Sequence, residues 1–212
     1  MKVSVFNTQG ADTGRQVELP EAIFGIEPNK HAVWLDVKAY LANQRQGTAE
    51  TKERNLISGS TRKLHKQKGT GGSRKGDIKN PVFRGGGTIF GPNPRDYSEK
   101  VNKKVKTLAR KSVLSDKAAQ GKVMVIEDFS FDKPRTKELS AVLKNLKVLD
   151  KKALFVIPDY DQSLILSGRN LPKTRLLHAR DLNTYSILHS NVVVVAESAL
   201  PKLEETLLST AK

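Results

Sequence analysis

A glycine-rich, strongly cationic stretch in the middle of the chain limits what it can fold into. Asp77 is the only acidic residue between Arg54 and Arg95, and large apolar side chains are few there. A segment of this composition cannot bury enough apolar surface to offset the entropy lost when it becomes ordered. We therefore predict a long inserted loop, residues 44–96, that becomes ordered when a polyanion supplies negative charge. Its cationic residues include Arg54, Arg62, Lys63, Lys66, Lys68, Arg74, Lys75, Lys79, Arg84 and Arg95.

The overall charge points to the same kind of partner. The 212-residue chain has a formal net charge of +15 and a pI of about 10.0, a balance typical of proteins that bind nucleic acid or an anionic membrane surface. No apolar run approaches the roughly 20 residues that span a bilayer, and no secretory signal is evident. The absence of cysteine excludes disulfides and thiolate metal sites. We expect a cytoplasmic protein that does not bind a membrane.

Regular patterns flank the insert on both sides. Alternating residues within 3–19 predict a short β-hairpin. Asn29 is a candidate cap for a helix that we expect to end near residues 46–47, where glycine can stop it. After the insert, apolar spacing predicts a second helix from around Tyr97 to about Gln120.

The C-terminal half alternates short apolar runs with helical patterns. Continuous apolar strands separated by helices are typical of a parallel sheet that is covered on both faces. We predict an α/β fold class, a three-layer α/β/α domain with a mainly parallel sheet, in which residues 1–212 form a single domain carrying the long basic loop. The expected strands are 123–126, 153–157, 175–179 and 192–196, and the expected helices are 137–149, 162–170, 183–189 and one starting near 199.

Acidic residues follow several predicted strands and raise the question of catalysis. Glu127, Asp128 and Asp159 could together bind a divalent metal, so a metal-dependent nuclease or phosphoryl-transfer enzyme is the alternative function. The simpler interpretation, which we favour, is that acids at strand-to-helix junctions cap the helices. The four histidines show no metal-ligand spacing, and no phosphate-binding or nucleophile motif is present. We therefore predict no enzyme, no catalytic residue, no metal site and no cofactor.

Structured RNA fits the cationic insert better than a DNA operator does. Each Lys or Arg that neutralises a phosphate releases counterions, and no signature of a sequence-reading DNA module is present. His65, Phe83 and Phe90 are candidates for stacking on bases, and the two phenylalanines are equally candidates for a small apolar cluster. The residues that we expect to bind RNA are Arg45, Arg54, Arg62, Lys63, His65, Lys66, Lys68, Arg74, Lys75, Lys79, Arg84, Arg95, Lys103 and Lys104.

Several motifs in and around the insert resemble one known family. Residues 45–48 read RQGT, residues 66–71 read KQKGTG, and residues 77–87 read DIKNPVFRGGG. VNKK at 101–104 and SGRNL at 167–171 add to the likeness. Together they resemble bacterial ribosomal large-subunit protein four, the universal L-four family, over nearly the whole chain.

The resemblance implies a function in the large ribosomal subunit. It implies a globular domain on the subunit surface, a loop that threads inward through rRNA, and rRNA binding early in assembly that joins several rRNA domains. The implied partners are large-subunit rRNA, neighbouring large-subunit proteins and the nascent polypeptide, and no homo-oligomer is expected. The resemblance places the loop tip at residues 63–74. The tip residues that would line the polypeptide exit tunnel are Lys66, Gln67, Lys68, Gly69, Thr70 and Gly71.

Overall fold

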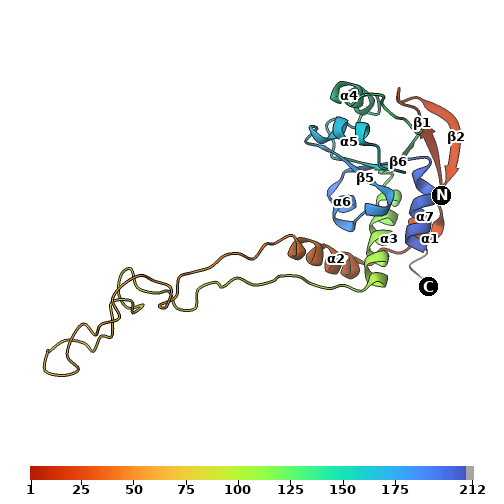
Figure 1. Cartoon of the computed structure of the whole chain (residues 1–212). Coiled ribbons are helices and arrows are strands. Elements are labelled where there is room, and N and C mark those ends of the chain that lie inside the picture. Colours follow the sequence, from red (N-terminus) through yellow and green to blue (C-terminus); the bar gives the residue numbers. More distant parts are fainter. Residues whose placement is uncertain (209–212) are drawn as a thin grey trace. The chain divides into compact units, whose positions relative to one another are not determined.

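Residues 1–208 are described by a computed structural model, and the chain divides into two units (Figure 1). The first, here called the sheet unit, comprises Met1–Leu41 and the described residues from Glu99 onward. The second, here called the insert unit, is Ala42–Ser98 and contains almost the whole basic insert. No helix among the described residues combines the length and apolarity needed to cross a bilayer.

One mixed sheet of six strands forms the centre of the sheet unit. Its strand order is β2-β1-β3-β6-β4-β5. The pair β1–β2 is antiparallel and is the predicted hairpin, whereas every other neighbouring pair is parallel. The strands are β1 (Lys2–Phe6), β2 (Asp12–Glu18), β3 (Val123–Ile126), β4 (Ala153–Ile157), β5 (Thr174–His178) and β6 (Val192–Ala196).

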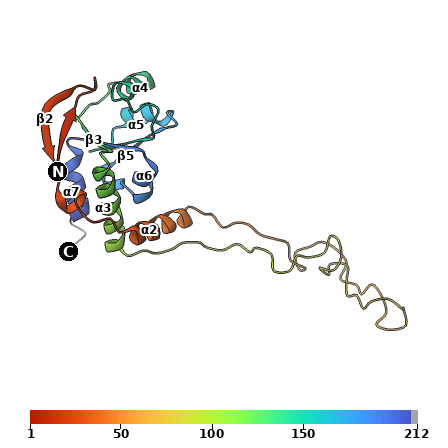
Figure 2. The same ribbon diagram turned by 180° about the vertical axis from the view of Figure 1, so that it is seen from behind.

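Helices cover both faces of this sheet, as Figures 1 and 2 show from opposite sides. The helices are α1 (Glu21–Phe24), α2 (Lys30–Asn43), α3 (Lys103–Ala119), α4 (Thr136–Asn145), α5 (Gln162–Arg169), the 3-10 turn η1 (Ala179–Asp181), α6 (Thr184–His189) and α7 (Ala199–Leu208). Val193 and Val195 of β6 join one core with α1, α3, α6 and α7, whereas Val192 and Val194 join a second core with α4 and α5. This alternation confirms the predicted α/β fold, with a mainly parallel sheet between two helical layers.

Helix α2 begins as predicted but ends earlier. The Asn29 side chain accepts a hydrogen bond from the Ala32 backbone N–H at 3.0 Å and so caps the helix. The helix ends at Asn43 rather than near 46–47. Gly47 does not stop the helix, because its carbonyl accepts a hydrogen bond from the Arg95 N–H, near the other end of the insert, at 3.1 Å. Trp34 of helix α2 is 57% exposed.

Two further boundaries differ from the predictions by a few residues. Helix α3 begins at Lys103 rather than around Tyr97, because the Tyr97 ring contacts side chains of the insert unit. Strand β5 ends at His178 rather than at Ala179, which is the first residue of η1.

Helix α4 also ends early, at Asn145, whereas the prediction extended to residue 149. Lys147 adopts a left-handed conformation with φ 57°. The Val148 N–H then donates to the Leu143 carbonyl at 3.0 Å, the six-to-one bond of a Schellman motif. Glycine usually occupies the left-handed position, so a lysine there left no stop signal in the sequence.

Candidate nucleic-acid interface

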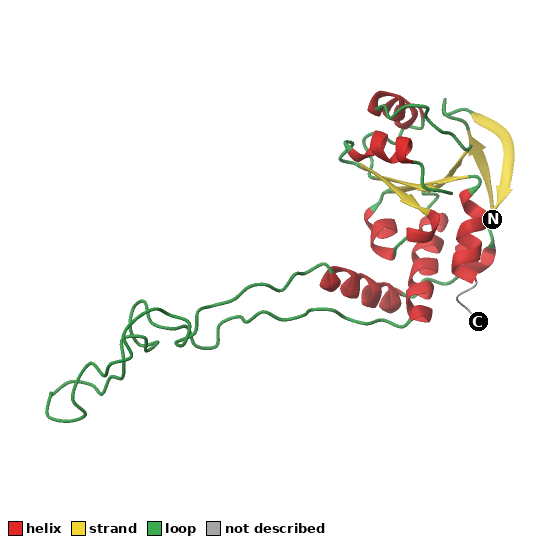
Figure 3. Cartoon of the chain, in the orientation of Figure 1, coloured by secondary structure: helices red, strands yellow, loops and turns green. Residues whose placement is uncertain are grey.

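Apart from the end of α2, the insert unit contains no helix or strand, and Figure 3 draws it as loop throughout. Its outgoing limb (residues 48–62) and its returning limb (residues 75–94) are nevertheless joined by backbone hydrogen bonds. The Thr51 N–H donates to the Pro92 carbonyl at 3.1 Å, and the Thr88 N–H donates to the Lys52 carbonyl at 3.0 Å. Such isolated bonds set the register of the two limbs without making a continuous ladder.

Glycine allows the limbs to approach closely at one point in particular. Gly87 is buried, and a Cβ atom at this position would overlap the backbone of Arg54 on the other limb. The Gly87 N–H donates to the Lys79 carbonyl at 2.9 Å. Any side chain here would force the limbs apart. Glycine is therefore needed at this position because it has no Cβ atom, and not because it makes the backbone flexible.

The single acid of the cationic span is paired inside the insert unit. One carboxylate oxygen of Asp77 lies 2.8 Å from the Arg54 guanidinium, and the Asp77 side chain is 7% exposed. The other oxygen, Oδ1, is buried without a hydrogen-bond partner among the described residues. Arg54, which we expected to bind RNA, therefore has one face committed to Asp77 and about half of its side chain exposed.

At the base of the insert, two of the expected RNA-binding arginines stack on one aromatic ring. The guanidinium carbons of Arg45 and Arg95 lie 3.7 Å and 4.4 Å from the centre of the Tyr97 ring. A hydrogen bond from Arg95 and the positive charges of both arginines lower the pKa of the Tyr97 hydroxyl. Stacking of this kind holds the guanidinium planes without consuming all of their N–H donors.

The positive charges of the other expected RNA-binding residues are not neutralised by acidic side chains of the described chain itself. Lys63 Nζ donates to Gln67 Oε1 at 2.5 Å, and Lys75 Nζ lies 5.4 Å from the centre of the half-buried Phe83 ring. The rest are exposed or half-buried, and none forms an ion pair within the described part of the chain. They are Arg62, His65, Lys66, Lys68, Arg74, Lys79, Arg84, Lys103 and Lys104.

Most of the large apolar side chains of the insert unit are exposed, a feature that spacing alone did not reveal. Phe90 is fully exposed and has a left-handed backbone with φ 57°, and Val82 is 84% exposed. Phe90 is therefore not the anchor of an apolar cluster. Exposed apolar groups between exposed cations provide surface for contact with a partner.

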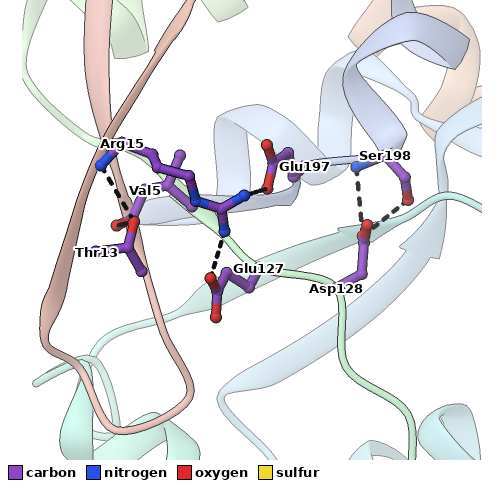
Figure 4. A network of polar contacts seen from close by, with 7 residues as sticks. All are labelled: Val5, Thr13, Arg15, Glu127, Asp128, Glu197 and Ser198. Carbon is purple, nitrogen blue, oxygen red and sulfur yellow. Dashed lines mark hydrogen bonds and ion pairs between the residues drawn. The ribbon is translucent and has the colours of Figure 1, made fainter.

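The acids at the carboxyl ends of the strands are held by partners within the sheet unit (Figure 4). Arg15 of β2 forms ion pairs with both Glu127 and Glu197. Asp128 accepts hydrogen bonds from the Ser198 N–H at 3.3 Å and the Ser198 hydroxyl at 2.7 Å, at the start of α7. These acids therefore hold the start of α7 and the Arg15 side chain of β2 at the carboxyl ends of β3 and β6.

The remaining acids at this edge have the same kind of role. Lys202 of α7 donates to Asp159 at 2.5 Å, and this hydrogen bond lowers the pKa of the Asp159 carboxyl. Asp161 caps α5 by accepting from the Ser163 N–H at 2.9 Å. No group of three potential metal-ligating side chains occurs among residues 1–208. Asp161 and Asp128 bind N–H groups at helix starts, as the favoured interpretation predicted. Glu127, Glu197 and Asp159 instead form ion pairs with Arg15 and Lys202, a structural role that the capping prediction did not include.

These features define a class of protein: an α/β unit with an inserted, glycine-rich element that presents unpaired cations, as nucleic-acid-binding proteins do. Comparison with known sequences identifies the family. The profile described as the ribosomal protein L4/L1 family matches residues 17–206. The chain is 57% identical over 205 residues to the large ribosomal subunit protein uL4 of Parabacteroides distasonis, covering 97% of this chain and 98% of that protein.

Two other relatives match over nearly their whole length. The large ribosomal subunit protein uL4 of Phocaeicola vulgatus is 54% identical over 98% of this chain and 100% of its own length. The corresponding protein of Flavobacterium psychrophilum is 54% identical over 98% of this chain and 99% of its own length. The chain belongs to the ribosomal protein L4/L1 family, which confirms the resemblance seen in its motifs. This is a family of structural ribosomal proteins and not of enzymes.

Proposed function

We propose that this chain is a structural constituent of the large ribosomal subunit and binds its rRNA. Family membership and near full-length relatives named as large-subunit proteins support this assignment. Its partners are large-subunit rRNA and neighbouring ribosomal proteins, and its place of action is the ribosome in the bacterial cytoplasm. We further propose that it binds rRNA early in assembly and contacts several rRNA domains.

The main support for the proposed binding of rRNA is the positive charge of the insert, most of which has no acidic partner within the described chain. Between Arg54 and Arg95 the only carboxylate is that of Asp77, and it is already paired with Arg54. The exposed cations that remain are spread over both limbs and the tip. A polyanion that passes between or alongside the limbs would neutralise several of them together, and the release of its counterions would drive binding.

The tip, residues 63–74, is proposed to form part of the wall of the polypeptide exit tunnel. Every residue from 61 to 74 is exposed, so none of them contributes a buried side chain to the insert unit. The Leu64 N–H donates to the Gly76 carbonyl at 3.1 Å and closes the base of this tip. A closed, exposed loop of Lys, Gln, Gly and Thr can contact rRNA on one side and a nascent polypeptide on the other.

Cosedimentation with the large subunit tests this proposal. Tagged full-length chain should sediment with large subunits, remain bound through a moderate salt wash, and be absent from free small subunits. A variant lacking residues 63–74 should retain the sheet unit's fold and still associate, since the limbs keep most of the cations. Failure of the intact chain to associate with large subunits, under conditions where other large-subunit proteins do, would overturn the proposed function.

A further inference from the structure

A pocket at the amino ends of β4 and β5 is lined by cations that the proposed insert contacts do not use. Its volume is about 360 Å³. None of its lining residues carries a carboxylate, although acids are common elsewhere on the sheet unit. Its basic lining residues come from the start of β4, the end of α5, the α5–β5 connection, β5 and the end of α6. They are Lys152, Arg169, Lys173, Arg175 and His189.

Aromatic stacking fixes one wall of this pocket. The rings of Tyr185 and His189, one turn apart on α6, stack with centres 5.6 Å apart and planes 12° apart. Tyr40 of α2 stacks on the other side of Tyr185 at 5.2 Å. Lys152 Nζ lies 3.2 Å from Nε2 of His189. The ammonium donates to the imidazole nitrogen, so the ring holds Lys152 in position at the pocket edge.

A buried lysine contacts the backbone of one of the residues that line the pocket. Lys117 of α3 is buried, and its Nζ donates to the Ser190 carbonyl at 2.6 Å. Ser190 lines the pocket and follows the last residue of α6. The lysine thereby offsets the partial negative charge of a carbonyl at a helix C-terminus, which would otherwise repel an anion.

The pocket also contains an unused hydrogen-bonding group. Ser186 lines it and is 3% exposed, and its hydroxyl oxygen has no partner among the described residues. The Ser186 N–H is already occupied by the Asn183 side chain at 2.8 Å. A buried hydroxyl without a protein partner is uncommon in a native fold, and a hydrogen-bonding group placed at this wall of the pocket would satisfy it.

The charge of this pocket is not neutralised internally. None of Arg169, Lys173 and Arg175 forms an ion pair in the described chain. At the carboxyl ends of the strands, by contrast, Glu127 and Glu197 are paired with Arg15, and Asp159 is paired with Lys202. Cations and acids thus pair at the carboxyl ends of the strands, whereas the pocket at the amino ends contains basic residues and no carboxylate.

We propose that this pocket binds a phosphate group of an RNA backbone and so anchors the sheet unit to RNA independently of the insert. Guanidinium groups bind phosphate oxygens through paired hydrogen bonds, which suits Arg169 and Arg175 at the rim. The volume of about 360 Å³ accommodates a phosphate with part of its sugar, and the aromatic ring of the lining, His189, already has one face stacked on Tyr185. The choice of RNA as the source of the phosphate rests on the proposed function, whereas the affinity for a phosphate anion does not.

The first experiment titrates inorganic phosphate into isotopically labelled full-length chain and follows arginine side-chain and backbone NMR signals. Saturable shifts of the Arg169, Arg175 and Ser186 signals are expected. The shifts of Arg169 and Ser186 should be lost in Lys173→Gln/Arg175→Gln. All three should be kept in Lys133→Gln/Lys137→Gln, which removes the same charge from exposed lysines elsewhere on the sheet unit. Shifts equal in the two double variants, or no shift at all, overturn the pocket as a phosphate site whatever the insert does.

The second experiment measures the affinity of the same three proteins for large-subunit rRNA over a range of salt. Loss of one phosphate contact should lower the slope of log K against log salt by about 0.7–0.9 and weaken binding about 5- to 8-fold at 0.1 M salt relative to 1 M. The control variant should show a smaller change.

The other outcomes are distinguishable. If phosphate titrates the pocket while rRNA affinity matches the control variant, the site binds a free anion and the RNA assignment is wrong. If polyglutamate shifts the NMR signals of the pocket residues but does not compete with rRNA for binding to the chain, the pocket binds an acidic protein partner and the proposal is overturned. If the unaltered chain does not bind rRNA, the proposed function itself fails, a result that the phosphate titration does not depend on.

Discussion

Removing two arginines from the insert should weaken rRNA binding by an amount that the structure allows us to work out. Arg74 and Arg84 are both exposed, and neither forms an ion pair in the described chain. Their charge is therefore available to phosphate. The variant Arg74→Gln/Arg84→Gln removes two positive charges without removing apolar packing or an internal ion pair.

The expected magnitude follows from counterion release. Two lost phosphate contacts, at about 0.7–0.9 each, lower the salt slope by about 1.4–1.8. Between 1 M and 0.05 M salt, log salt changes by about 1.3, so the variant should lose about two decades of affinity at the lower salt, or roughly 2.5–3 kcal/mol. Near 1 M salt the variant and the unaltered chain should bind almost equally.

The assay is filter binding or fluorescence anisotropy with large-subunit rRNA at five or more salt concentrations. Lys133→Gln/Lys137→Gln is the matched control, because it removes the same formal charge from exposed lysines outside the insert. An unchanged slope in the insert variant, or an equal decrease in the control, would refute the attribution of binding to local phosphate contacts and leave only a net-charge effect.

Three further predictions concern the fold and its alternatives. Gly87→Ala should shift the amide NMR signals around Arg54, because its Cβ would overlap that backbone, and leave the unfolding midpoint of the sheet unit unchanged; unaltered signals would contradict the close approach. Asp128→Ala should lower the unfolding free energy by about 1 kcal/mol in urea denaturation, because the hydrogen bonds to Ser198 are lost. Magnesium-dependent cleavage of RNA or DNA by the unaltered chain would instead support the nuclease alternative. Burial lowers the pKa of Lys117 below 10.5, so between that lowered pKa and 10.5 the unfolded chain binds more protons than the folded chain. The stability of the unaltered chain relative to Lys117→Met should therefore rise from pH 7 to pH 10 in paired denaturation curves, and a fall would contradict the burial of this charge.

Much of the fold was predictable because its central strands are continuous apolar runs. Strands β3, β4 and β6 have the predicted bounds, since a strand buried on both faces leaves little ambiguity in sequence. Helix ends were less predictable where the backbone uses an unexpected residue. Lys147 takes the left-handed position at the end of α4, and Gly47 pairs with Arg95 instead of ending α2.

The candidate interface was only partly visible in the sequence. Its charge and glycine content depend on composition alone and could be read directly. Which cations are neutralised depends on distant partners, such as Asp77 for Arg54 and, at the sheet edge, Glu127 for Arg15, 112 positions along the chain. The cationic pocket could not be found at all, because Lys152 and Arg169 come together only when the strands and helices pack.

Hydrogen exchange of the insert amides, compared between free chain and chain bound to large-subunit rRNA, tests the central claim most directly. We expect amides of residues 54–95 to exchange quickly in the free chain, where few of them have backbone partners, and to become strongly protected on rRNA, with little change in the strands of the sheet. Equal protection of these amides with and without rRNA would contradict the claim that RNA charge orders the insert.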